Sequence, residues 1–225
     1  SRSGDGIRAD VASFERVSEL ITKHQPAYVF HLAAESTTAH EALFTNHAAI
    51  SSGTLNILEA CKLHCPNARI FIPGSAMQFR NEGKPITEHD EFEAKSPYAV
   101  ARIHSVYAAR YYRSLGLHAY VGYLFHHESP HRQASHISQI VVQAARQARA
   151  GENVQIEIRD PSFQKEWTFA GDVTKAMFAL LDQDNIFEVV IGSGEAHSIE
   201  EWLDACFALA GKPWKEFVSV PKNFL

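Results

Sequence analysis

The chain has 225 residues, of which 45% are hydrophobic and 21% are charged, proportions typical of a globular protein. Its formal net charge of -5 excludes the basic surface that nucleic-acid binding requires. No apolar run approaches the roughly 20 residues that cross a bilayer, and no signal peptide is present. The three cysteines, Cys61, Cys65 and Cys206, match neither a disulfide framework nor a metal-binding spacing. We therefore expect a cytoplasmic protein that has no membrane or nucleic acid as partner.

Helical and strand patterns alternate through the first half of the chain. Three stretches with apolar residues at helical spacing each precede a short apolar run. The helices are expected over 11–21, around 55–62 and after 97, and the strands over 28–32, 69–72 and 118–125. Continuously apolar strands that alternate with helices predict a parallel sheet with helices on both faces.

The pattern changes after residue 125, where a polar, histidine-rich loop over 126–131 is expected. The elements expected after it are a helix over 137–150, a strand over 154–158, a helix over 172–181, a strand over 189–191, a last helix and a possible strand over 217–220. Ser198 and Glu201 form a capping box for the last helix.

These elements predict an α/β protein with a Rossmann-like, doubly wound parallel sheet and a small C-terminal α/β substrate lobe. We expect residues 1–125 to form the dinucleotide-binding domain, incomplete at its N-terminus because the glycine-rich first βαβ unit is absent from this sequence. Residues 126–225 are expected to form the substrate-binding lobe, with interleaved Rossmann elements and an incomplete C-terminus.

Two hydroxyl side chains are expected at the carboxyl edge of the sheet, where open α/β sheets bind ligands. Ser75 closes a predicted strand, and Tyr98 opens a predicted helix. A tyrosine can serve as acid or base on a sugar hydroxyl if a neighbouring cation lowers its pKa from about 10. A serine hydroxyl can share the same oxygen, so Ser75 and Tyr98 are candidate catalytic residues.

Several motifs resemble those of the extended short-chain dehydrogenases, also known as NAD-dependent epimerases and dehydratases. The segment SPYAVAR at 96–102 is similar to the family's SPYAxSK segment, and HLAAES at 31–36 is similar to its HLAAxS strand end. Within the family, LFHHESP at 124–130 resembles the LFNHESP pattern of the GDP-mannose 4,6-dehydratases. The segment GSGEAHS at 192–198 resembles the TGExHS pattern of the same group.

The resemblance implies that NADP or NAD is the cofactor and that a nucleotide-diphosphate sugar, GDP-linked, is the substrate. The implied reaction is oxidation at sugar C4, loss of water across C5 and C6, and return of the hydride to C6. A homodimer or homotetramer is implied as well. The implied cofactor-binding residues are Arg2, Asp10, Val11, Leu32, Ala33, Ala34, Tyr98 and Arg102, and the implied substrate-binding residues are Ser36, Met77, His126, Glu128, Ser129 and Lys165.

Three residues differ from the family pattern. Arg102, the third candidate catalytic residue, replaces the family lysine and keeps its charge, but it cannot deprotonate or relay protons. Met77 replaces a glutamate that would act in dehydration, and His126 replaces an asparagine. A 4-keto-sugar reductase or epimerase is therefore an alternative function, and a catalytically weakened, nucleotide-binding regulatory subunit is another. The histidines near residue 130 lack a metal-binding spacing, so no metal site is expected.

Overall fold

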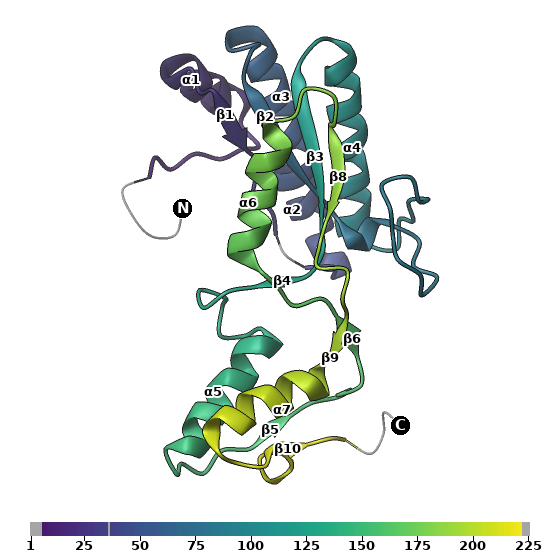
Figure 1. The fold of residues 1–225 in the computed structure, drawn as a ribbon. Coiled ribbons are helices and arrows are strands. Elements are labelled where there is room, and N and C mark those ends of the chain that lie inside the picture. The colour runs from purple at the N-terminus through teal and green to yellow at the C-terminus, as the bar shows by residue number, and fades with distance from the viewer. Residues whose placement is uncertain (1–5, 36, 222–225) are drawn as a thin grey trace. The chain divides into compact units, whose positions relative to one another are not determined.

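The computed structural model describes residues 6–35 and 37–221. The chain divides into two compact units, whose individual folds are drawn in Figure 1. The first unit contains the residues up to 125 together with 174–191, and the second contains 126–173 and the residues from 192 onward. Within the described residues, no helix is long and apolar enough to cross a membrane.

The first unit contains the three predicted helix–strand pairs, so these predictions are confirmed. Its elements are α1 (Phe14–His24), β1 (Tyr28–Phe30), η1 (His40–Ala42), α2 (Leu43–Asn46), the π-helix η2 (His47–Ser52), α3 (Gly53–His64), β2 (Arg69–Ser75), η3 (Ala76–Gln78), α4 (Pro97–Ser114), β3 (His118–Leu124), most of α6 (Ala170–Leu181) and β8 (Glu188–Ile191). The first strand is shorter than predicted and the second is longer, since β1 ends at Phe30 and β2 continues to Ser75.

The four strands form one parallel sheet in the order β1-β2-β3-β8, which confirms the predicted sheet type. In Figure 1, α6 lies on one face of this sheet, and α3 and α4 lie on the other. Side chains alternate accordingly along β2: Ile70 and Ile72 belong to the core on the α3 and α4 side. On the α6 side, the Phe30 ring lies 5.9 Å from the Phe71 ring and 4.9 Å from the Phe178 ring. The apolar strands are therefore covered on both faces.

A half-buried carboxylate, that of Glu188, joins α4, β3 and β8. Glu188 accepts two hydrogen bonds from Arg110, at 2.9 and 2.7 Å, one from Arg113 at 3.1 Å and one from the Tyr123 hydroxyl at 2.6 Å. Burial alone would raise the pKa of this carboxyl group, but the hydrogen bonds from Arg110 and Tyr123 outweigh burial and lower its pKa to about 2. Glu188 thus stays ionised inside the unit.

The second unit is built around two helices and three small two-stranded sheets. Its elements are β4 (His127–Glu128), α5 (Ile137–Arg149), β5 (Ile156–Glu157), β6 (Gln164–Lys165), β7 (Thr168–Phe169), β9 (His197–Ser198), α7 (Ile199–Ala210), η4 (Trp214–Glu216) and β10 (Val218–Ser219). The predicted capping box is confirmed, because Ser198 and Glu201 each accept a hydrogen bond from the other's backbone N–H. The expected loop over 126–131 is wrong in part, since His127 and Glu128 pair with β7.

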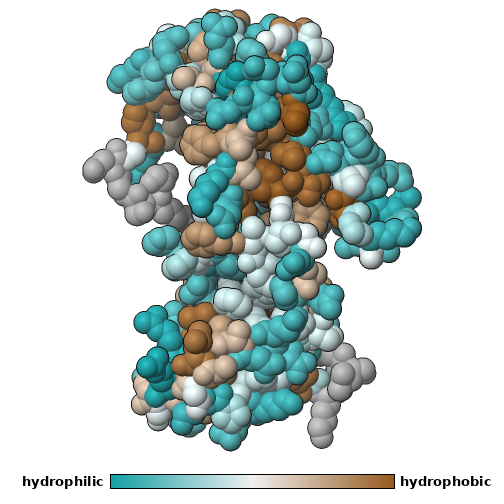
Figure 2. All heavy atoms as spheres, in the orientation of Figure 1, coloured by the Kyte–Doolittle hydropathy of each residue, from teal (hydrophilic) through white to brown (hydrophobic). Residues whose placement is uncertain are grey.

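Hydrophobic side chains are exposed on both units between larger hydrophilic areas (Figure 2). Phe178 of the first unit is 47% exposed, and Leu209 of the second unit is 83% exposed. Among the three tyrosines of α4 after residue 106, Tyr112 is buried and donates to Glu59, whereas Tyr107 and Tyr111 are exposed. The helix thus presents aromatic side chains on its outer face.

The carboxyl group of Glu188 makes the stability of the protein depend on pH. Because its pKa falls from the ordinary 4.5 to about 2 on folding, its contribution is complete above pH 4.5 and is lost as the pH falls toward 2. We expect the wild type to lose about 3 kcal/mol of unfolding free energy from this group across that interval. Urea unfolding at a series of pH values measures the loss.

The Glu188→Gln variant should be less stable at neutral pH, and its stability should fall less steeply below pH 4.5. Glu152→Gln, at an exposed position of the second unit, is the matched control and should keep the wild-type slope. Equal slopes for the wild type and Glu188→Gln would contradict this assignment.

Candidate active site

Ser75 is the last residue of β2 and lies at the carboxyl edge of the sheet. Its side chain is buried, and its hydroxyl accepts a hydrogen bond of 3.2 Å from the Met77 N–H. This hydrogen bond caps the start of the 3-10 turn η3. The preceding residue must be glycine, because a Cβ atom on Gly74 would lie 2.5 Å from Cδ1 of Tyr123. The close approach of the Tyr123 ring thus determines where the strand end runs.

Tyr98 lies in the first turn of α4. The helix begins with Ser96 as N-cap, whose hydroxyl accepts from the Ala99 N–H at 3.1 Å, and with Pro97 at the first helical position. The helix packs against both β2 and η3, the elements that carry and follow Ser75. Tyr98 is half-buried.

Arg102 lies one helical turn after Tyr98 and is only 5% exposed. One guanidinium nitrogen donates a hydrogen bond of 2.8 Å to the Pro73 carbonyl oxygen of β2. The guanidinium carbon lies 5.1 Å from the centre of the Tyr98 ring, within the range of a cation–π contact. Arginine remains protonated in proteins, so the site contains a permanent positive charge beside the phenol.

His31 is a buried residue of this region for which the motif analysis predicted no role of its own. It follows β1, is 2% exposed, and its pKa is lowered to about 4 by burial and by the charge of Arg102. A Cβ atom on Gly53 would lie 3.2 Å from its ring. His31 is therefore neutral near pH 7 and adds no second charge beside Arg102. The signals in the sequence were its place directly after an apolar run and at the start of the HLAAES segment.

Of the other residues expected to hold the cofactor, three follow β1 and two precede α1. Leu32 is 59% exposed, while Ala33 and Ala34 are half-buried. They continue from β1, which pairs with β2, and so they lie at the same carboxyl edge as Ser75. Asp10 is exposed, and its carboxylate accepts a hydrogen bond of 2.9 Å from the Ala12 N–H. The Val11 carbonyl oxygen accepts a hydrogen bond from the side chain of Asn56 in α3.

The chemistry of these groups fits a nicotinamide dinucleotide. Small side chains leave space at the strand end, an apolar side chain is available for a planar ring, and an acidic side chain can accept a ribose hydroxyl. In Arg102, the Nε atom is buried and has no hydrogen-bond partner among the described residues.

Four polar residues of the second unit form a group that we call the Glu128 cluster: His126, Glu128, Arg132 and Lys165. All except Arg132 were expected to bind substrate. The Glu128 carboxylate lies 2.8 Å from His126 and 3.9 Å from Arg132. Burial lowers the pKa of Lys165, and the charge of Glu128 partly opposes this shift. Arg132, Lys165 and His126 thus lie around one carboxylate. Their remaining N–H groups can donate hydrogen bonds to an anionic ligand. Arg132 was not predicted.

The remaining expected residues are not all in this cluster. The Ser129 hydroxyl accepts a hydrogen bond of 3.1 Å from the His131 N–H and thereby stabilises a turn. Met77 belongs to the first unit and is 55% exposed. Arg2 and Ser36 lie outside the described residues. Within residues 6–35 and 37–221, no group of three histidine, cysteine, aspartate or glutamate side chains is placed to hold a metal ion.

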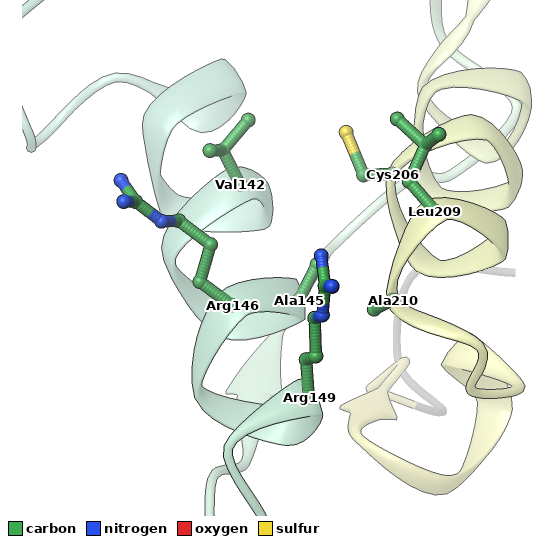
Figure 3. A pocket seen from close by; sticks show the side chains of 7 residues that line it. All are labelled: Val142, Ala145, Arg146, Arg149, Cys206, Leu209 and Ala210. Carbon is green, nitrogen blue, oxygen red and sulfur yellow. The ribbon is translucent and has the colours of Figure 1, made fainter.

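A groove runs between α5 and α7 of the second unit (Figure 3). Its lining is largely apolar, with two arginine side chains beside it, and consists of Val142, Ala145, Arg146, Arg149, Cys206, Leu209 and Ala210. None of the residues expected to bind substrate or cofactor lines this groove.

Solved structures identify the class of fold. The chain matches the UDP-glucose 4-epimerase of Thermus thermophilus, solved with NAD, over 97% of its own length and 73% of that chain, with a TM-score of 0.78 and 24% identity. It matches RMD from Pseudomonas aeruginosa, complexed with NADPH, over 94% and 75% of the two chains, with a TM-score of 0.83 and 21% identity. The fold is therefore a Rossmann fold.

The family model for GDP-mannose 4,6 dehydratase matches residues 5–221. The chain therefore belongs to the GDP-mannose 4,6 dehydratase family. It is 30% identical to GDP-mannose 4,6 dehydratase 1 of Arabidopsis thaliana over 97% of this chain and 62% of that protein. It is 26% identical to the human GDP-mannose 4,6 dehydratase over 86% of this chain and 54% of that protein. The chain thus spans less than two thirds of the length of these relatives.

The contact between Gly74 and Tyr123 predicts a large effect of a single methyl group. In Gly74→Ala, the new Cβ would overlap the ring, and the end of β2 would have to shift. We expect a loss of about 1–3 kcal/mol in the free energy of unfolding, measured by urea denaturation. A second substitution, Tyr123→Leu, removes the ring, so the cost of Gly74→Ala should fall in that background. An unchanged cost there would contradict the steric explanation.

Proposed function

We propose that the protein is an NAD(P)-dependent enzyme that modifies a nucleotide-diphosphate sugar, GDP-linked, through a 4-keto intermediate, as the GDP-mannose 4,6-dehydratase family implies. The observation that carries the proposal is the arrangement around Tyr98. Its ring lies beside the buried Arg102, and its helix packs on the strand and turn that hold Ser75. A phenol, a hydroxyl and a fixed positive charge are the groups that proton transfer at a sugar hydroxyl needs.

Each group then has a role. Tyr98 removes the proton from the sugar hydroxyl at C4, and Ser75 donates a hydrogen bond to the same oxygen. Arg102 contacts the Tyr98 ring through a cation–π interaction and holds it in place. NADP or NAD, when bound, would supply the hydride chemistry at the sugar carbon. Asp10, Val11 and the segment 32–34 would hold that cofactor at the carboxyl edge.

The Glu128 cluster supports an anionic substrate. Lys165 and Arg132 carry positive charge in a partly buried setting, where an interaction with phosphate oxygens is less screened than in water. We propose that these two side chains, with His126 and Ser129, bind the diphosphate. Glu128 orients His126 and Arg132 for that purpose.

Met77 favours a second candidate function, a 4-keto-sugar reductase or epimerase. The side chain follows Ser75 by two residues and is 55% exposed, and a thioether can neither remove nor deliver a proton. The candidate therefore keeps the redox step at C4 and omits the elimination of water.

The first test concerns Tyr98. In Tyr98→Phe, the proton acceptor is lost while the ring remains, so turnover should fall by at least about a hundredfold. Binding of NADP and of a GDP-sugar, measured by calorimetry on the full-length protein, should stay within about twofold of the wild type. Normal turnover in this variant would exclude Tyr98 as the acid or base.

The second test is the mass of the product formed from GDP-hexoses and their 4-keto derivatives. Elimination removes one water, reduction adds two hydrogens, and epimerisation leaves the mass unchanged. Because Met77 provides no proton-transfer group, we expect no loss of water. A product lighter by one water would restore the dehydratase assignment. Tight NADP binding without any product would point to the regulatory subunit instead.

A further inference from the structure

Gln78 is a fully buried glutamine at the end of the 3-10 turn that follows Ser75. Its side-chain oxygen accepts a hydrogen bond of 2.8 Å from the Ser75 N–H. The Ser75 hydroxyl in turn accepts from the Met77 N–H at 3.2 Å. Gln78 thus bonds to the backbone of Ser75, while the turn that it ends bonds to the Ser75 hydroxyl.

The main chain of Gln78 makes a second connection. Its carbonyl oxygen accepts a hydrogen bond of 2.8 Å from the Glu93 N–H. Phe79, the next residue, pairs with Phe92, and their rings lie 5.1 Å apart. Residues 92 and 93 lead into Ser96, the N-cap of the helix that carries Tyr98. Gln78 therefore connects the end of β2 to the segment that starts α4.

The space around the Gln78 amide is closely filled. A Cβ atom on Gly74 would lie 3.2 Å from its oxygen, and the Tyr123 ring covers Gly74 from another side. A buried N–H that loses its acceptor is unfavourable, so the Ser75 backbone would move to find another one. Because the amide is 0% exposed, Gln78 acts through Ser75 and does not touch a substrate.

We infer that Gln78 is a positioning residue, which fixes the Ser75 hydroxyl relative to Tyr98 by accepting the Ser75 N–H and by holding residue 93. The kinetic part of this inference rests on the proposed function. A misplacement of about 1 Å at a reacting group is enough to slow catalysis strongly without weakening substrate binding.

Two variants of the full-length protein test the role of the acceptor. Gln78→Met keeps the length of the side chain but removes the oxygen, and Gln78→Glu keeps an acceptor oxygen. We expect Gln78→Met to lower kcat by at least about tenfold with KM within about twofold, and Gln78→Glu to recover most of that loss. Gln147→Met, the same change at an exposed position of α5, is the control and should leave both constants unchanged. Equal losses in the two Gln78 variants would overturn the inference.

Hydrogen exchange of the Ser75 amide, followed by ¹⁵N NMR, provides a readout that needs no turnover. The exchange should be at least about tenfold faster in Gln78→Met than in the wild type, while the amide of Ile70 in the same strand keeps its rate. An unchanged Ser75 rate would overturn the inference even in an active enzyme. If the wild type lacks activity, the proposed function fails, and the exchange measurement still decides whether Gln78 holds Ser75.

Discussion

The ionised carboxylate of Glu188 is the interaction on which the first unit depends. It accepts hydrogen bonds from two arginines of α4 and from Tyr123 of β3, and thereby joins the helix to two strands of the sheet. Such a group is costly to bury without its partners, and removal of the carboxylate leaves both arginines and the tyrosine without this acceptor. Tyr123 has a second role, because its ring also packs over Gly74, directly before Ser75. The hydrogen bonds of Glu188 thus help to fix the ring that packs beside the candidate catalytic serine.

The electrostatics of the site are simple. The guanidinium group of Arg102 is held by a backbone carbonyl of β2, and the neighbouring His31 is kept neutral by burial. One fixed charge therefore faces Tyr98 across the neutral pH range. The second unit differs, since the pKa values of Lys165 and Glu128 depend in part on the charges of neighbouring residues.

Much of the fold and part of the candidate site were predictable from the sequence. The alternation of apolar strands and helices predicted the parallel sheet, and the strand end and helix start predicted that Ser75 and Tyr98 lie on neighbouring elements. The short strands β4 and β7 were not predictable, because two polar residues pair there only when distant segments meet. The partner of Arg102 and the burial of His31 likewise arise from tertiary packing, and no local spacing encodes them. The bond between Gln78 and Ser75 is different, because it belongs to a capping box whose residues are three positions apart in the sequence.

The contact among Gly74, Gln78 and Tyr123 has a consequence for the variation that related proteins can tolerate. A larger residue at 74 requires a smaller ring at 123, and a shorter side chain at 78 opens space beside both. These three positions should therefore change together among relatives and seldom singly. Their joint variation would be visible in an alignment as covariation between positions up to 49 residues apart in the chain.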